Sequence, residues 1–352
     1  MTHPCTHTLQ HTNTREVVLL IPYGILSNNP SFQTRALYLL SSSLTMSRRM
    51  RLLDAEDLDG PRSQQVSHYS SMLWSLWLWD ILLALHTDHP TTFSASEISS
   101  TGPFSSVPFQ KMYRELCNET WKPTPPDPRP EDRVLRDQGF LLIMAILSDA
   151  ITMRRSLGTD RDFMDATAAE VYQHNPFTPL SAREELDRME EQLWRALDRY
   201  DAVYGDSLTS DLQALYQYTR LYISCKGVTS LCRVAHDATL GAPGLASLYA
   251  WGRQNVMRQE SVDHAWSVLH FVAKRGSDPA TACPTWFPIV TFHAALVVWA
   301  RISQGRHSAP SARGGENMHA LSWFKTELEV MQFPCCTVMV AVLDMLMSGG
   351  AV

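Results

Sequence analysis

The amino-acid sequence predicts an all-α protein, a bundle-like body built from many helices. Apolar residues recur every three or four positions in one segment after another, the spacing that places them on one face of a helix. No segment shows the strict alternation of apolar and polar residues that is typical of a half-buried strand. No motif repeats at the fixed period of ~34 or ~40 residues that marks a helical solenoid. These observations favour one multi-helix body.

Length and charge limit the function classes. The chain has 352 residues, of which 45% are hydrophobic, enough to bury a sizeable core. Its formal net charge is −6, and its pI is ≈ 6.1. Domains that hold nucleic acid are usually basic. We therefore do not expect this body to hold DNA by itself.

The cysteines and the apolar runs indicate a soluble protein with reduced thiols. Seven cysteines at irregular spacing in a long chain argue against a disulfide framework. The N-terminus lacks the apolar core of a secretory signal. The longest apolar runs, 140–147 and 294–300, are far shorter than the ~20 residues that span a bilayer. We expect no membrane contact.

Residues 1–14 are polar and are expected to form a disordered tail, followed by one helical domain over 15–350. Val17 to Ile25 is apolar but contains Pro22, which removes a backbone donor and clashes with the preceding turn. This segment predicts a shortened or kinked helix. Ser31 to Met50 carries a clear amphipathic pattern and predicts the second helix.

The next helix follows a polar link around 54–65 and is unusually rich in tryptophan. Trp74, Leu78, Ile81 and Leu85 recur at helical spacing, and three tryptophans fall between positions 74 and 79. Such a helix is expected to be buried in a large helical body. A His-Pro turn ends it, and Ser94 or Ser96 is placed to cap a short helix that carries Glu97.

Three more helices are predicted in the middle of the chain. Phe104 to Glu119 is the first, and Arg133 to Arg155 is a strongly apolar second. Between them, residues 121–132 contain five prolines and predict a non-helical connection. After a break at 175–179, Ser181 and Glu184 form a capping box before a helix that runs to about Tyr204.

The C-terminal half predicts long helices separated by turns. Leu208 to Ala235 and Ala246 to Lys274 are each expected to be continuous, with the Gly241–Gly244 turn between them. Trp286 to Ile302 is the next helix, and 305–318 is expected to be a flexible loop. Two short helices separated at Pro334 end the chain.

Two motifs together resemble a known family. The first is Tyr23, Gly24 and Ile25 followed by a helix that ends in paired Arg48 and Arg49; the second is the tryptophan helix with its central Asp80 and the turn at Pro90. The combination resembles the helical regulatory region, or middle homology region, of fungal-specific transcription factors, over about 15–302. The turn departs from the family's Gly-Arg-Pro-Pro at Asp88, His89 and Thr91.

The resemblance implies a transcriptional regulator in the nucleus. Its helical body would bind protein partners, itself or a small effector, and so tune a DNA-bound complex. Regulators of this kind often control neighbouring metabolic genes, so control of a fungal secondary-metabolite pathway is a natural extension. The rival hypothesis is an all-α enzyme of such a biosynthetic pathway.

The zinc module that accompanies this region in the family is not predicted here. A binuclear cluster needs six closely spaced cysteines, and only Cys5 lies before residue 117. Cys225 and Cys232 are expected on one helical face, two turns apart, as core thiols. DNA contact is therefore expected only indirectly or through a module missing from this chain, which would then be truncated relative to a DNA-binding parent.

No catalytic, cofactor-binding or metal-binding residue is predicted. Three groups have suitable side chains, but none has the spacing or supporting residues of a metal site. They are His3, Cys5, His7 and His11; His86, Asp88 and His89, read as a polar turn; and Asp149, Asp160, Asp162 and Asp165. The sequence also lacks the nucleophile elbow, the phosphate loop and the dinucleotide fingerprint.

Charged clusters are interpreted structurally. Arg48, Arg49 and Arg51, and the pair Arg154–Arg155, lie near predicted helix ends, where cations favourably meet the negative end of the helix dipole. Contact with phosphate or a nuclear-import signal is the alternative. The acidic residues between 184 and 191 are interpreted as the solvated side of an amphipathic helix.

Overall fold

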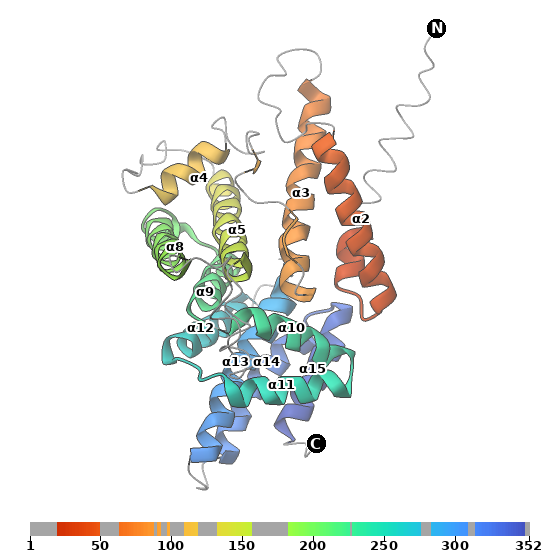
Figure 1. The fold of residues 1–352 in the computed structure, drawn as a ribbon, viewed down its shortest axis with the longest axis vertical. Coiled ribbons are helices and arrows are strands. Elements are labelled where there is room, and N and C mark those ends of the chain that lie inside the picture. Colours follow the sequence, from red (N-terminus) through yellow and green to blue (C-terminus); the bar gives the residue numbers. More distant parts are fainter. Residues whose placement is uncertain are drawn as a thin grey trace.

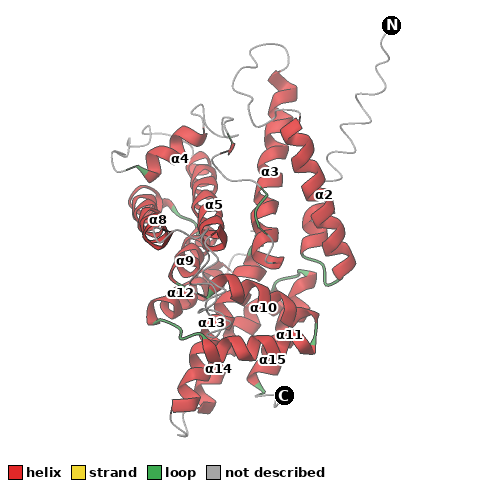
Figure 2. Cartoon of the chain, in the orientation of Figure 1, coloured by secondary structure: helices red, strands yellow, loops and turns green. Residues whose placement is uncertain are grey.

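The computed structural model of the protein describes residues 20–49, 63–87, 90–92, 97–98, 109–118, 132–156, 182–225, 227–275, 283–308 and 314–348. Within these ranges the chain forms helices and connecting turns and no strand, so the all-α prediction is confirmed (Figure 2). Residues 20–25 are also helical. The helices are α2 (Pro30–Arg49), α3 (Ser63–Thr87), α4 (Phe109–Cys117), α5 (Asp132–Ser156), α8 (Ala182–Tyr204), η3 (Gly205–Ser207), α9 (Ser210–Ser224), α10 (Val228–Leu240), α11 (Ala242–Gln254), α12 (Gln259–Arg275), α13 (Phe287–Ser308), α14 (Gly314–Val330) and α15 (Pro334–Met347).

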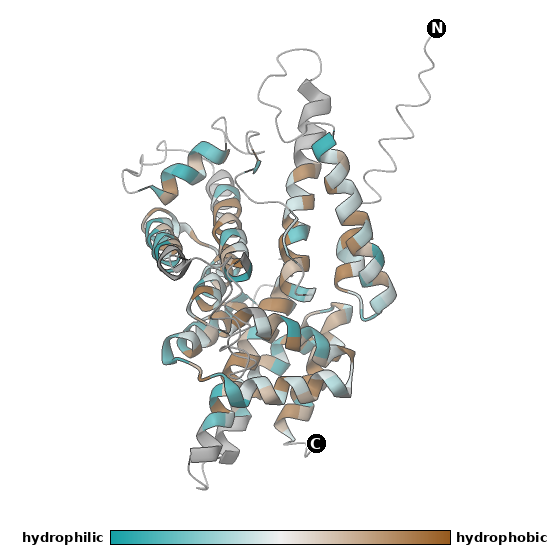
Figure 3. Cartoon of the chain, viewed as in Figure 1, coloured by the Kyte–Doolittle hydropathy of each residue, from teal (hydrophilic) through white to brown (hydrophobic). Residues whose placement is uncertain are grey.

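The helices form two arms above a denser base (Figure 1). One arm is the pair α2 and α3, which pack along each other, and the other contains α4, α5 and α8. The base holds α9 to α15, with α9 against α12, and α13 against α12 and α14. Figure 3 shows mostly hydrophilic residues on α8 and many hydrophobic residues in the base. Polar helices therefore lie at the edge of the body.

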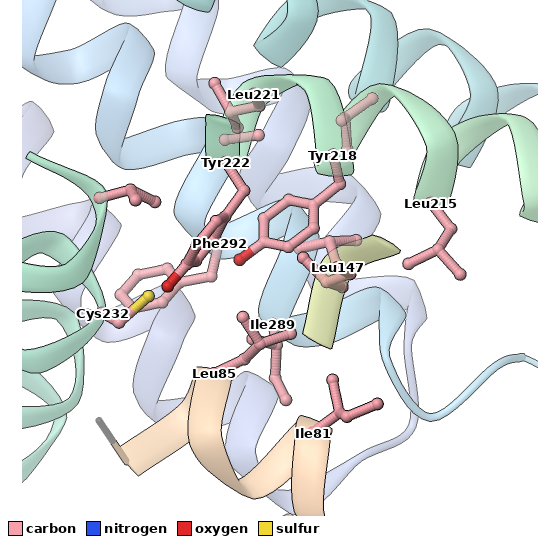
Figure 4. Close-up of a cluster of buried hydrophobic side chains, with 14 of the residues drawn as sticks. Ile81, Leu85, Leu147, Leu215, Tyr218, Leu221, Tyr222, Cys232, Ile289 and Phe292 are labelled. Atoms are coloured by element: carbon pink, nitrogen blue, oxygen red, sulfur yellow. The ribbon is translucent and has the colours of Figure 1, made fainter. Parts of the chain in front are cut away.

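Helix α13 is the centre of the base. Every residue from Phe287 to Ala300 is buried, because α9, α10, α11, α12, α14 and α15 all pack around it. Figure 4 shows how neighbouring helices contribute to the same core: Ile81 and Leu85 of α3, Tyr218 and Tyr222 of α9, and Phe292 of α13 converge. One continuous hydrophobic cluster extends from Ile21 to Leu346.

Several predicted elements are confirmed. The amphipathic segment predicted over 31–50 is α2, and the apolar segment predicted over 133–155 is α5. The tryptophan helix is α3, which begins at Ser63, inside the segment predicted to be a polar link. The glycine turn after α10 is present, with Gly241 at a φ of 137° and Pro243 in the first turn of α11. Pro334 begins α15.

The prediction of one helix over 208–235 was wrong. α9 ends at Ser224 and α10 begins at Val228. Gly227, the residue before α10, lies so close to Asn255 that an added Cβ would be 2.7 Å from its Oδ1. Trp251 Nε1 donates hydrogen bonds to the Gly227 carbonyl (3.3 Å) and to Ser230 Oγ (3.1 Å). Contacts from α11 and from Asn255 after it therefore stabilise the turn between α9 and α10.

The prediction of one helix over 246–274 was also wrong. α11 ends at Gln254 and α12 begins at Gln259. The Asn255 side chain donates to the Trp251 carbonyl (3.0 Å). Gln304 of α13 donates to the carbonyls of Gly252 (3.2 Å) and Asn255, and its Oε1 accepts from Met257 N (3.2 Å). A side chain from a distant helix thus satisfies the backbone groups that the break leaves open.

The other boundaries differ by smaller amounts. α13 extends to Ser308 and α14 begins at Gly314, so the loop predicted over 305–318 is shorter than expected. The described part of the helix predicted over 104–119 contains α4, which begins at Phe109, and residues 104–108 lie outside the described residues. The tail at 1–14, most of the proline-rich connection at 121–132, the break at 175–179, Ser181, Ser94 and Ser96 lie outside the described residues. Within the described ranges, no helix combines the length and apolar character needed to cross a bilayer.

Candidate functional site

Histidine, tyrosine and cysteine side chains form one cluster in and beside the core. This histidine cluster consists of His86 of α3, His236 of α10, His293 of α13, and their neighbours Tyr218 and Cys232. Tyr218 Oη lies 2.8 Å from His293 Nδ1, and Cys232 Sγ lies 3.9 Å from the same nitrogen. The His86 and His236 rings are 5.5 Å apart.

Two histidines of the cluster, His86 and His293, are uncharged at neutral pH. Burial lowers the pKa of His293 to about 3. Burial, with smaller contributions from His236 and His293, likewise lowers the pKa of His86 to about 3. Burial also raises the pKa of Tyr218 well above its ordinary value. A neutral imidazole bonded to a tyrosine hydroxyl holds α9 and α13 together without a buried charge.

His86 departs from its predicted position in a polar turn. It lies inside α3, is buried, and faces the ring of His236. Its Nε2 has no hydrogen-bond partner within the described part of the chain. Asp88 and His89 lie outside the described residues, as do His3, Cys5, His7 and His11.

The two cysteines predicted on one helical face are separated by the break between α9 and α10. Cys225 follows α9, and its backbone N–H donates to the Leu221 carbonyl (2.9 Å). Cys232 lies within α10 and faces His293. Both thiols are buried, so their interpretation as core residues is confirmed, whereas their shared face is not.

Asp149 has a structural partner in place of a metal. Its Oδ2 accepts a hydrogen bond from the Tyr113 hydroxyl at 2.7 Å, and burial raises the pKa of the Asp149 carboxyl. Asp160, Asp162 and Asp165 lie outside the described residues. Across the described ranges, no group of three or more His, Cys, Asp or Glu side chains is placed to hold a metal ion.

Two of the residues that carry the family resemblance, Arg48 and Asp80, both bind Thr92 and form a structural joint. Asp80 is buried in α3, and its carboxylate accepts hydrogen bonds from the backbone N–H (2.6 Å) and the hydroxyl (2.8 Å) of Thr92. Arg48 of α2 donates to the Thr92 carbonyl (2.6 Å) and pairs with Glu97 (3.1 Å). These contacts join α2, α3 and the segment after α3. Trp74 packs edge-on against Phe109 of α4.

The paired arginines of α5 also make structural contacts. Arg154 pairs with Glu190 of α8 at 3.2 Å and donates to the Ile223 carbonyl at the end of α9. Arg155 donates to the Ala84 carbonyl of α3 (3.1 Å). The structural interpretation agrees with these contacts, but the partners belong to other helices rather than to the end of α5. Arg51 lies outside the described residues.

Helix α2 presents an exposed stripe to solvent, here called the α2 stripe. It consists of Arg35, Tyr38, Ser42, Met46 and Arg49, all exposed and spaced by three or four residues along one face of the helix. Tyr38 is 68% exposed and Met46 is 61% exposed. Arg35 and Arg49 border these two apolar side chains.

A second surface, here called the tryptophan groove, lies between α12 and α14. Trp266, Leu269, Ala273 and Trp323 supply its apolar lining, and its volume is about 610 Å³. The Trp266 and Trp323 rings meet edge-to-face with 5.9 Å between their centroids. Lys274 of α12 and Glu327 of α14 add opposite charges to the lining. The size falls in the range of small-molecule sites.

The comparisons with known proteins add no relative: no protein-family model, curated protein or solved structure matches this chain. The candidate surfaces are therefore defined by the chain's own geometry. Sequence spacing did not identify either of them, because Trp266 and Trp323 are far apart in the chain and the exposed face of α2 depends on its packing against α3.

Proposed function

We propose that the protein is a transcriptional regulator that acts in the nucleus through protein contacts made by its helical body. The motif resemblance over residues 15–302 supports this assignment. The described helices also offer an exposed interaction surface, the α2 stripe, on a helix otherwise anchored to the core. Control of genes of a fungal secondary-metabolite pathway is the extension that the same resemblance suggests.

The α2 stripe is the observation that carries the proposal. Residues 20–49 contain three arginines and no carboxylate, although the whole chain has a net charge of −6. Arg35 and Arg49 make no ion pair within the described part of the chain. Their matching partner is an amphipathic helix with a central apolar strip bordered by carboxylates.

A second copy of the chain fits the α2 stripe less well. Two α2 stripes facing each other would bring arginines against arginines, in either direction of the helices. The acidic helix α8 offers carboxylates at Asp187, Glu191 and Asp198, but no large apolar side chain in its described part is exposed. A separate partner protein with an acidic amphipathic helix would supply both the carboxylates and the apolar strip.

A reporter assay tests this function. The full chain is fused to an unrelated DNA-binding domain, and reporter transcription is compared with that of the Tyr38→Ser/Met46→Ser double variant. We expect the fusion to change transcription. The double variant should lose most of that change, because the apolar strip of the partner helix would then face two serines in place of Tyr38 and Met46. Val330→Ser is the matched control, since Val330 is 66% exposed on α14, away from α2.

Two outcomes would contradict the proposal: a fusion without effect on the reporter, or a double variant as active as the unaltered fusion while circular dichroism shows both folded. Deletion of the gene followed by transcriptome measurement extends the test. A contiguous block of altered transcripts is the expected result. Unaltered transcripts with a single lost metabolite would favour catalysis.

The alternative, an all-α enzyme of a biosynthetic pathway, has one observation in its favour. Cys232 Sγ lies 3.9 Å from His293 Nδ1, a thiol beside an imidazole. Both side chains are almost completely buried, and the imidazole nitrogen already lies 2.8 Å from the Tyr218 hydroxyl. This alternative would be favoured if the purified protein formed product from pathway intermediates and the Cys232→Ala variant did not.

A further inference from the structure

The tryptophan groove combines three features that point to one class of ligand. Its walls include two tryptophan rings, and Trp323 is 56% exposed, so an aromatic face is open to a ligand. Trp266 is held in place from behind by Phe324, whose ring centroid is 5.4 Å away. Leu269 and Ala273 extend the apolar lining along α12. A flat apolar group fits such a surface through stacking and apolar burial.

The groove also presents an unpaired positive and an unpaired negative charge. Lys274 and Glu327 both line it, and neither side chain makes an ion pair or hydrogen bond within the described part of the chain. The Glu327 side chain is partly buried, and this burial raises the pKa of its carboxyl. Two opposite charges held apart in one groove are suited to a ligand that carries both signs.

A ligand of a single charge is matched less well. An ammonium ion would be attracted by Glu327 and by the tryptophan faces but repelled by Lys274. A carboxylate would be attracted by Lys274 but repelled by Glu327. A molecule with an ammonium group, a carboxylate and an aromatic ring meets all three features at once.

We propose that the tryptophan groove binds a small aromatic zwitterion of the α-amino-acid type, with its ring against Trp266 and Trp323, its ammonium group at Glu327 and its carboxylate at Lys274. This makes the groove an effector site, separate from the α2 stripe. The binding itself does not depend on the transcriptional assignment; its regulatory meaning does.

A titration of the purified full chain with four probes tests the proposal. L-tryptophan carries all three groups, tryptamine lacks the carboxylate, indole-3-propionate lacks the ammonium group, and L-alanine lacks the ring. Binding is followed by isothermal calorimetry or saturation-transfer NMR. We expect L-tryptophan to bind with a Kd between about 1 μM and 1 mM, and each of the other probes to bind at least about tenfold more weakly.

Substitutions test which residue binds the ammonium group of the ligand and which binds its carboxylate. Glu327→Gln should weaken binding of L-tryptophan at least about tenfold, or about 1.4 kcal/mol, without weakening indole-3-propionate. Lys274→Met should weaken L-tryptophan without weakening tryptamine. Trp323→Ala should weaken all three ring-containing probes, and circular dichroism checks that the variant, which loses the edge-to-face contact with Trp266, is folded. Glu329→Gln is the matched control, because this carboxylate of α14 is exposed and pairs with Lys325 at 3.6 Å.

Three results would overturn the proposal. The first is no binding of L-tryptophan up to about 10 mM. The second is equal binding of tryptamine or indole-3-propionate, which would show that only one charge matters. The third is concentration-dependent self-association that Trp323→Ala abolishes, which would make the groove a contact between copies. Because these measurements need no transcription, their failure is distinguishable from failure of the α2 stripe in the reporter assay.

Discussion

Helices α13 and α2 both contain apolar residues along their length but use them differently. In α13, all residues from Phe287 to Ala300 are buried by helices on every side. In α2 only four residues are buried, and Tyr38 and Met46 point to solvent. An apolar side chain in α13 stabilises the fold, whereas an exposed one in α2 contributes little to it. The comparison separates the part of the molecule that holds the structure from a part that is free to contact a partner.

Acid is expected to act on the buried region and to produce the largest effect. The pKa values of His86 and His293 are lowered to about 3 in the folded protein, against about 6.5 in the unfolded chain. Between these values the unfolded state binds more protons, so the free energy of unfolding falls as pH decreases through this range. From pH 6 to pH 4 the two histidines together would lower it by about 5 kcal/mol.

Urea unfolding at pH 7, 6, 5 and 4 measures this loss. His86→Phe removes one of the two titrating groups, and the variant should lose about half as much stability between pH 6 and pH 4. Helix α2 contains no histidine, so substitutions on its exposed face should leave the slope unaltered. An identical pH dependence in His86→Phe and the unaltered protein would refute the role of this histidine.

Truncation of a core aromatic in α13 is the next largest effect. Phe292→Ala should lower the free energy of unfolding by about 3–5 kcal/mol, because the side chain is almost completely buried and its removal leaves a cavity. Guanidinium unfolding followed by circular dichroism gives the value. A loss below about 1 kcal/mol would show that this helix is not the packed centre of the base.

The close approach of α11 to α13 predicts an intermediate effect. A Cβ at Gly252 would lie 2.5 Å and 2.7 Å from ring atoms of Trp299, which is itself buried. Gly252→Ala should therefore destabilise the protein by about 1–3 kcal/mol through overpacking. Gly252→Ala should cost less stability when it is introduced into the Trp299→Leu variant than when it is introduced into the unaltered protein, because the smaller side chain leaves room for the added methyl group. No such coupling in the thermal or urea unfolding curves would contradict the predicted contact.

The smallest effect is expected on the exposed face of α2. Tyr38→Ala should alter the free energy of unfolding by no more than about 0.5 kcal/mol, since the ring is mostly exposed. The same urea unfolding experiment measures it beside Phe292→Ala. A loss comparable to that of the core variant would mean that Tyr38 supports the fold, and the α2 stripe would then no longer be a free surface.

The sequence predicted the fold class and those helices whose pattern is local. α2, α5 and the buried tryptophan helix follow from the spacing of apolar residues, and proline or glycine marks the start of α15 and the turn at Gly241. The break at 255–258 has no such signal, because it contains neither glycine nor proline. It exists because Gln304, a residue of the distant helix α13, satisfies its backbone groups.

The candidate sites were harder to predict for the same reason. Trp266 and Trp323 belong to helices that meet only in the folded chain, and a tryptophan in an amphipathic helix is usually a core residue. His86 was misplaced because its neighbours Asp88 and His89 suggested a polar turn, whereas the last turn of α3 faces α10. Only long-range packing decides which of these side chains reach solvent.

The hydrogen bonds of Gln304 to the segment between α11 and α12 have a mechanical consequence. This glutamine ties the start of α12 to α13, while the far end of α12 carries Lys274 in the tryptophan groove. If α12 rotates about this tethered start, Lys274 at its far end moves furthest, and the groove widens there. Gln304→Ala would remove this tether without altering a residue that lines the groove.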